Sequence, residues 1–180
     1  MLRVFNPLNG KGIIYYFVLI FALMSVCKAN AQITPATPGI QAIMFSKILS
    51  YVRTIDEGDS YTVLVVYDAN SGQPSDIINS FREEGLNVII SKVSEIESEI
   101  DKTPILYLPS RLSEESIKKL NSYKNKLLIT GNPEYALNGS ASLSVGLEDE
   151  RIKILVNLGV LEGNNHQVSS ELINLARVIK

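Results

Sequence analysis

Polar side chains follow three of the apolar, strand-like runs of the sequence, at the point where each run ends. Asp68 and Asn70 follow the first run, Arg111 follows the third, and Asn132 follows the fourth. Parallel strands end at one edge of a sheet, where α/β proteins bind ligands, so these residues could form the rim of a pocket for a small solute or a glycan. Asn and Asp are also ordinary turn formers. Both interpretations stay open, and ordinary turn chemistry is the one we favour.

The sequence contains no set of residues whose types and spacing identify a catalysed reaction. The only cysteine is Cys27 and the only histidine is His166, which lies in a polar stretch and is expected at the surface. Cys27 lies in the segment that we predict below to be a cleaved signal, so the exported chain has no thiolate nucleophile and too few ligands for a His/Cys metal site. No nucleophile elbow or phosphate-binding glycine loop occurs. The acidic residues at 95–99 and 148–150 resemble a solvated helix face and a turn, not a pair across a cleft. We predict a protein that is not an enzyme and that uses no metal or cofactor.

The first 31 residues predict a secretory signal. A basic start precedes an apolar run of 14 residues, Ile13–Val26, and small residues follow at 29–31. A membrane span needs about 20 residues, so the run fits a signal better than an anchor. Cleavage would make Gln32 the first residue of an exported protein. An uncleaved anchor and a lipid-modified Cys27 are the alternatives.

The exported part is mildly acidic. The segment at 1–31 holds three of the 17 Lys and Arg and none of the 19 Asp and Glu, so its removal changes the formal charge from −2 to −5. Such a charge gives no electrostatic reason to bind nucleic acid. The remaining chain has no cysteine, so its hydrophobic core must stabilise it without disulfides.

Apolar periodicity predicts one α/β domain at 40–180, after an extended lead-in at 32–39. Strands are expected at 61–67, 87–91, 104–108 and 126–130, with helices at 40–53, 75–84, 94–100 and 113–123. This alternation predicts a mostly parallel sheet flanked by helices. Two alternating runs, 141–147 and 151–158, predict an antiparallel hairpin at one edge of the sheet. A helix at 168–179, capped by Ser169, is expected to close the domain.

The predicted first helix carries two apolar stripes. One stripe holds Ile40, Ile43, Met44, Ile48 and Tyr51, and the other holds Phe45, Leu49 and Val52. A helix packed between the sheet and a second helix would need both stripes. Alternatively, the stripe of Phe45, Leu49 and Val52 contacts a second copy or a partner protein. We take those three residues as a candidate interface and predict a homodimer through this helix.

The end of the chain resembles a known family. Asn157-Leu158 ends the last predicted strand, and Ser169-Ser170 and Leu175-Ala176 follow after a short excursion. This order is similar to the C-terminal signature of the YfiR/HmsC family, and the segments at 41–49 and 105–109 also look like that family. Two departures are the absence of a Trp-Pro after the first helix and of the cysteines that form disulfides in some members.

The resemblance implies a function that the residues alone do not. It implies a periplasmic, non-enzymatic regulator that binds the periplasmic part of a membrane-bound signalling protein, a diguanylate cyclase or a similar sensor, and restrains it. Such a protein would act in cyclic di-GMP signalling and biofilm formation. The signature residues Asn157, Leu158, Ser169, Ser170, Leu175 and Ala176 would be structural. The alternative is a periplasmic module that binds a small solute or a cell-wall glycan through the rim described above.

Overall fold

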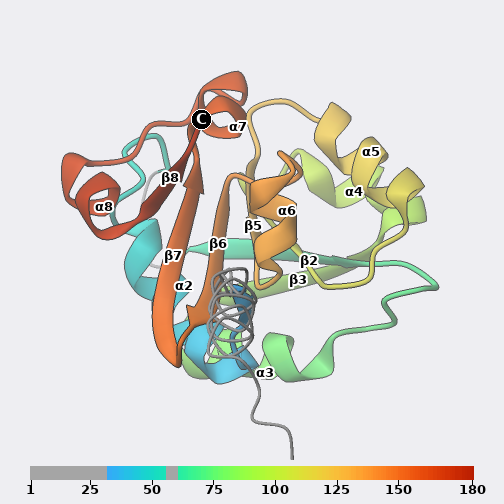
Figure 1. Ribbon diagram of the computed structural model, residues 1–180. Coiled ribbons are helices and arrows are strands. Elements are labelled where there is room, and N and C mark those ends of the chain that lie inside the picture. Colours follow the sequence, from blue (N-terminus) through green and yellow to red (C-terminus); the bar gives the residue numbers. More distant parts are fainter. Residues whose placement is uncertain (1–31, 56–60) are drawn as a thin grey trace, which may run out of the picture. The chain divides into compact units, whose positions relative to one another are not determined.

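Eight strands form one mixed sheet in the computed structural model, which describes residues 32–55 and 61–180 (Figure 1). The predicted secretory signal at 1–31 lies outside the described residues. The strands are β1 (Thr34–Pro35), β2 (Thr62–Tyr67), β3 (Asn87–Lys92), β4 (Ile105–Leu108), β5 (Leu127–Thr130), β6 (Leu143–Glu148), β7 (Arg151–Asn157) and β8 (Arg177–Ile179). Their order is β3-β2-β4-β5-β6-β7-β8, and β1 pairs with β6. Pairing is parallel except for β6 with β7 and β1 with β6.

Helices cover both faces of the sheet. They are α2 (Pro38–Leu49), α3 (Ser75–Glu83), α4 (Glu97–Ile100) after a 3₁₀ turn at Val93–Glu95, α5 (Glu114–Ser122), α6 (Pro133–Leu137), α7 (Leu158–Gly163) and α8 (Ser170–Leu175). One hydrophobic cluster joins α2, α3 and α8 to the sheet, and a second joins α4, α5 and α6 to it. Strand β2 runs between the two clusters, and its four central residues, 63–66, are fully buried. This explains its unbroken apolar sequence. The predicted fold class is confirmed.

The C-terminal end differs from the prediction in detail. The last helix is confirmed, but it ends at Leu175, and Ala176 has an extended backbone that leads into β8. Strand β8 pairs in parallel with β7, so the β6–β7 hairpin does not lie at the edge of the sheet (Figure 1). The apolar spacing of residues 168–179 fits a helix. Val178 and Ile179, however, are β-branched, which favours a strand, and their backbone groups pair with the otherwise open edge of β7.

The stripe of Phe45, Leu49 and Val52 is not a surface. Phe45 and Leu49 are 0% exposed and Val52 is 3% exposed, so the prediction that they form a partner or dimer interface is wrong for the folded domain. The ring of Phe45 packs edge-on against Phe81 of α3 and Tyr107 of β4, at centroid distances of 6.3 and 6.4 Å. Because α3 and the sheet both cover α2, the helix needs two apolar stripes without any partner.

A polar network fixes α2 inside this core. The hydroxyl of Tyr107 donates to Oε1 of Gln41 at 2.7 Å, and Nε2 of Gln41 donates to the carbonyl of Ala36 at 2.7 Å. Burial raises the pKa of Tyr107, although the backbone N–H of Gly131 acts in the opposite direction. A Cβ on Gly131 would lie 2.0 Å from Oε1 of Gln41, so a side chain at this position would displace the network.

The hairpin turn is strained. Glu148 pairs with Arg151, which leaves Asp149 and Glu150 as a two-residue turn. Their φ angles are 50° and 61°. Positive φ at both positions is the geometry of a type I′ turn, which normally uses Asn and Gly. Asp is tolerated at the first of these positions, so the strain lies at Glu150, where such turns normally have glycine.

Candidate functional site

The strand order creates one topological switch point. After β2 the chain moves to β3 on one side, and it then returns to β4 on the other side of β2. In doubly wound sheets, ligands bind outside the carboxyl ends of the strands at such a point. Here the two loops at that place are residues 68–74, after β2, and residues 109–113, after β4. The predicted rim residue Asp68 is the first residue of the loop after β2.

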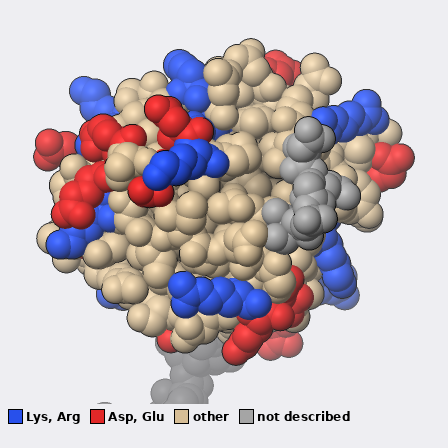
Figure 2. Space-filling view, turned by 180° about the vertical axis from the view of Figure 1, so that it is seen from behind, with Lys and Arg blue, Asp and Glu red and all other residues tan. Residues whose placement is uncertain are grey.

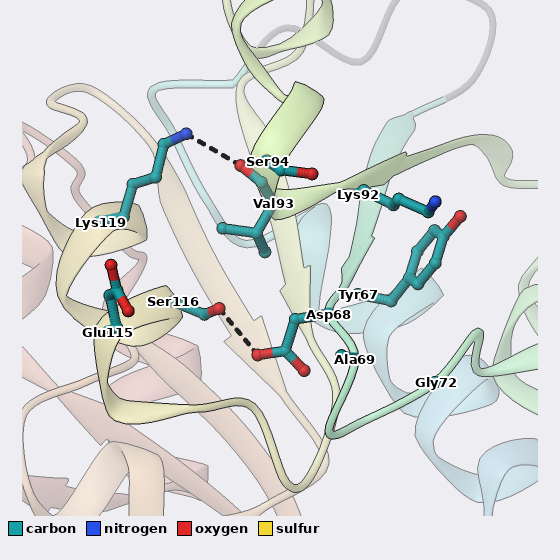
Figure 3. Close-up of a pocket in the computed structure, with 10 residues that line it drawn as sticks. All are labelled: Tyr67, Asp68, Ala69, Gly72, Lys92, Val93, Ser94, Glu115, Ser116 and Lys119. Carbon is teal, nitrogen blue, oxygen red and sulfur yellow. Dashed lines mark hydrogen bonds between the residues drawn. The ribbon is translucent and has the colours of Figure 1, made fainter.

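Asp68 ties these two loops together. Its Oδ1 accepts hydrogen bonds from the backbone N–H groups of Asn70 and Ser71, both at 2.9 Å. Its Oδ2 accepts from the backbone N–H of Ser113 at 2.8 Å and from the hydroxyl of Ser116 at 2.7 Å (Figure 3). Ser113 is the N-cap of α5, as predicted, and accepts from the backbone N–H of Ser116. The carboxylate therefore lies at the N-terminus of α5.

The electrostatics of Asp68 follow from these contacts. Burial acts to raise its pKa, but the backbone N–H groups of Ser113 and Ser71 and the hydroxyls of Ser116 and Ser113 outweigh burial and hold the pKa well below its usual range. A negative charge is also favourable at a helix N-terminus. Because a carboxylate already lies at this helix end, a phosphate there would meet a like charge.

The other predicted rim residues belong to local turns. The backbone of Asn70 completes the turn that Asp68 caps, and Oδ1 of Asn132 accepts from the N–H of Glu134 at the start of α6. Arg111 is exposed in the loop after β4, with a left-handed φ of 72°. Of the four, Asp68 alone is among the residues that line the hollow described next. Ligand binding by this set of four remains a prediction.

A hollow of about 620 Å³ opens beside Asp68. Tyr67 and Lys92, the last residues of β2 and β3, line it together with Ser94, and Ser116 and Lys119 of α5 form another part of its wall (Figure 3). None of these residues was expected at the site from the sequence, although Tyr67 ends the predicted strand at 61–67 and Lys92 directly follows the predicted strand at 87–91.

Lys119 and Ser116, two polar residues of the hollow, bond to other groups of the protein. Nζ of Lys119 donates to the carbonyl of Val93 at 3.0 Å and pairs with Glu97 at 2.6 Å. The Ser116 hydroxyl is bonded to Asp68, but a carboxylate with a lowered pKa is a weak base and cannot activate a hydroxyl. Among the residues that the structure describes, no group of three His, Cys, Asp or Glu side chains is placed to hold a metal ion.

Two of the signature residues at the end of the chain, Asn157 and Ser169, cap helices. Nδ2 of Asn157 donates to the carbonyl of Ala136 at 2.8 Å, and its Oδ1 accepts from the N–H of Val160 at the start of α7, at 3.0 Å. Ser169 caps α8, as predicted, by accepting from the N–H of Leu172. The prediction for His166 is wrong, because the residue is only 5% exposed. The short chain between α7 and α8 turns this ring inward, against the residues that follow α2.

Charges of both signs are dispersed on one face of the domain. Figure 2 shows Lys, Arg, Asp and Glu side chains of both signs around the margin of one face, with a central area that carries none of them. No large basic surface appears on this face, in keeping with the mildly acidic composition. No helix in the described ranges, 32–55 and 61–180, is long and apolar enough to cross a membrane.

Solved structures with a similar fold include two proteins of low sequence identity. A conserved domain protein from Vibrio cholerae O1 biovar El Tor superposes with a TM-score of 0.60 and 14% identity, over 81% of this chain and 61% of that one. The ABC domain from Streptococcus pneumoniae in complex with L-Trp gives a TM-score of 0.58 and 12% identity, over 79% of this chain and 60% of that one. The chain thus spans about three fifths of each structure, and identities this low establish the fold alone.

A comparison with curated protein sequences finds no significant match. A model of the YfiR/HmsC-like family, by contrast, matches residues 39–177, which is most of the described chain. Proteins of that family are periplasmic regulators of cyclic di-GMP signalling, they are non-enzymatic, and they interact with partner proteins. The resemblance in the C-terminal residues is confirmed, and the chain belongs to the YfiR/HmsC-like family.

Proposed function

We propose that this protein binds the periplasmic part of a membrane-bound signalling protein, a diguanylate cyclase or a similar sensor, and restrains its activity. The family match over residues 39–177 is the observation that carries this proposal. The chemistry around Asp68 is in keeping with it, because that carboxylate joins two loops of the domain.

Exposed apolar side chains suggest where the partner binds. Once the stripe of Phe45 and Leu49 is assigned to the core, α2 still exposes Ile43 at 41%, and β7 exposes Ile152 at 45%. Ile152 is paired with the partly buried Leu147 in the hairpin. Single exposed apolar residues are common on protein surfaces. The experiment below therefore tests whether Ile152 contacts the partner.

Restraint requires a difference in affinity. A ligand shifts a two-state equilibrium only by binding one state more tightly than the other. A preference of about 3 kcal/mol for the inactive state of the target would shift its equilibrium by more than about a hundredfold. No covalent step and no cofactor are needed for such an effect.

Deletion of the gene tests the proposal. Cellular cyclic di-GMP and biofilm mass should both rise, and the wild-type gene should restore them. Ile152→Glu should restore them poorly if the hairpin contacts the target, because a charge would enter an apolar contact. Arg151→Gln is the control, since it changes the neighbouring side chain on the opposite face of β7 without placing a like charge opposite Glu148, and it should restore them fully. Unchanged cyclic di-GMP and biofilm in the deletion strain would refute restraint of a cyclase.

The hollow beside Asp68 supports a second candidate function, recognition of a small solute or a cell-wall glycan. Its volume of about 620 Å³ and its place at the ends of β2 and β3 favour it. A thermal-shift screen of the purified protein against soluble cell-wall fragments tests this function. A fragment that raises the melting temperature of the wild type, but not that of a Tyr67→Ala variant, would support it. No shift with any fragment would count against it.

A further inference from the structure

The only histidine of the chain is buried at a junction. His166 lies between α7 and α8, and its Nδ1 is 2.8 Å from Oγ1 of Thr54, which follows α2. Its Nε2 is fully buried and has no hydrogen-bond partner among the described residues. The neutral ring satisfies the contact with Thr54 in either tautomer. The protonated ring carries an N–H at both nitrogens, and the one at Nε2 has no acceptor among the described residues.

The backbone around His166 joins two distant parts of the chain. The N–H of Arg53 donates to the carbonyl of Gln167, and the N–H of Ser169 donates to the carbonyl of Tyr51, both at 2.9 Å. Between them, residues 52 and 168 form an isolated antiparallel bridge. We call these contacts, with the bond between His166 and Thr54, the latch. The latch precedes α8 and β8, so it fixes the start of the segment that closes the sheet.

Charged groups of both signs lie around the ring, and the buried Lys126 opposes its protonation. Lys126, just before β5, is buried, and its ammonium donates to the carbonyls of Ile100 and Thr103. Burial lowers the pKa of His166, and the charge of Lys126 lowers it further. On the facing elements, Arg53 adds a positive charge in the turn after α2, and Glu162 of α7 is the acidic residue that lines the same hollow as the ring.

We propose that the protonation state of His166 controls the latch. Acid opens the latch and releases residues 164–180 from the rest of the domain. In the closed form the ring is neutral, its Nε2 is sealed from water, and Lys126 lies nearby. In the open form the ring reaches water and can take a proton on Nε2 without an acceptor from the protein. Protons therefore bind preferentially to the open form.

The direction of the effect follows from linkage. The closed form holds the pKa of His166 below its ordinary value of 6.5, so the closed form binds fewer protons than the open form. The closed form is therefore fully favoured above that ordinary value and loses its advantage as the pH falls below it. If the closed form takes no proton in this range, acidification from pH 7.5 to 5.5 raises the open-to-closed ratio about tenfold.

Release would uncover a specific surface. Leu172 of α8 is buried in the main core, and β8 covers the outer edge of β7. Opening would expose apolar core and an unpaired strand edge together, which is the surface that an extended apolar peptide recognises by strand addition. The family is periplasmic, and porins connect that compartment to the medium through water-filled pores, so the latch would sense external pH.

Two measurements on the wild-type protein test the latch. Because the chain has one histidine, NMR shows one imidazole, and its titration midpoint should lie below 6.5. Amide hydrogen exchange should give protection factors for residues 164–180 that fall by about tenfold from pH 7.5 to 5.5. Protection of the central strand β4 should not change over this range and serves as the internal control.

A His166→Gln variant completes the test. Its amide side chain does not titrate, so the pH dependence of protection at residues 164–180 should disappear, whatever the absolute protection of the variant. An imidazole that titrates at or above 6.5 in the wild type would overturn the proposal. Protection of residues 164–180 that does not depend on pH in the wild type would do so as well.

Discussion

Replacement of Asp68 by Asn, which exchanges one carboxylate oxygen for an NH₂ group, should destabilise the domain strongly. The carboxylate accepts two hydrogen bonds from its own turn and two from the start of α5. An amide keeps one acceptor oxygen and replaces the other with an NH₂ donor. Two of the four groups that donate to the carboxylate would then face a donor and lose their hydrogen bonds. Hydrogen bonds to a charged group contribute about 1.5–3 kcal/mol each. Water reaches this half-buried site and replaces part of the loss, so we expect Asp68→Asn to lower the free energy of unfolding by about 2–4 kcal/mol at pH 7.

Urea unfolding followed by far-UV circular dichroism measures this loss, since the chain has no tryptophan for fluorescence. The midpoint should fall while the denaturant slope stays unchanged. Glu115→Gln is the matched control, because it removes the same charge from an exposed carboxylate that lines the same hollow. The control should change stability by less than about 0.5 kcal/mol.

The loss should also depend on pH. The folded protein holds the pKa of Asp68 below its ordinary value of 3.8, so the carboxylate stabilises the fold fully above that value and progressively less as the pH falls through the folded pKa. The difference between wild type and Asp68→Asn should therefore be constant from pH 5 to 8 and shrink in stronger acid. A variant as stable as wild type, or a loss that is the same at pH 3 and pH 7, would refute this account of Asp68.

Three further substitutions test the packing and the turns by the same unfolding assay. Gly131→Ala should cost about 3 kcal/mol, because the added Cβ displaces the bonded side chain of Gln41, and a loss below about 1 kcal/mol would contradict that close approach. Glu150→Gly should stabilise the protein by about 0.5 kcal/mol, because glycine accepts the positive φ of the hairpin turn; a loss of stability would contradict the strain. Ser169→Ala should lower the free energy of unfolding by about 1 kcal/mol, because α8 loses its N-cap. An unchanged free energy would show that the cap does not stabilise the fold.

The parallel sheet was predictable because burial on both faces leaves a direct trace in sequence. Residues 63–66 are all apolar for that reason, and turn residues mark the end of each such strand. The end of the chain was harder to predict, because the apolar positions 172, 176 and 179 fit the spacing of a helix. Whether such a segment continues as a helix or turns into β8 depends on the open edge of β7, and this is tertiary information.

The candidate site was predictable only in part, for a similar reason. Asp68 was expected at the strand edge, but its partner Ser113 lies 45 residues further along the chain. Only the strand order, with β2 next to β4, brings the two together. His166 was assigned to the surface because its neighbours are polar. The same polar neighbours, however, form the turns that bring its ring to Thr54.

If partner binding and opening of the latch are coupled, each must change the equilibrium constant of the other, and this coupling can be measured. Binding and protonation that favour the same form of the protein must strengthen each other by equal factors. If the periplasmic part of the target binds the closed form, the complex should show an imidazole pKa for His166 below that of the free protein. If it binds the open form, through the edge of β7, the pKa should rise toward the ordinary value, and affinity should increase in acid. An imidazole titration that is identical in the free protein and in a saturated complex would show that the two proposals concern independent surfaces.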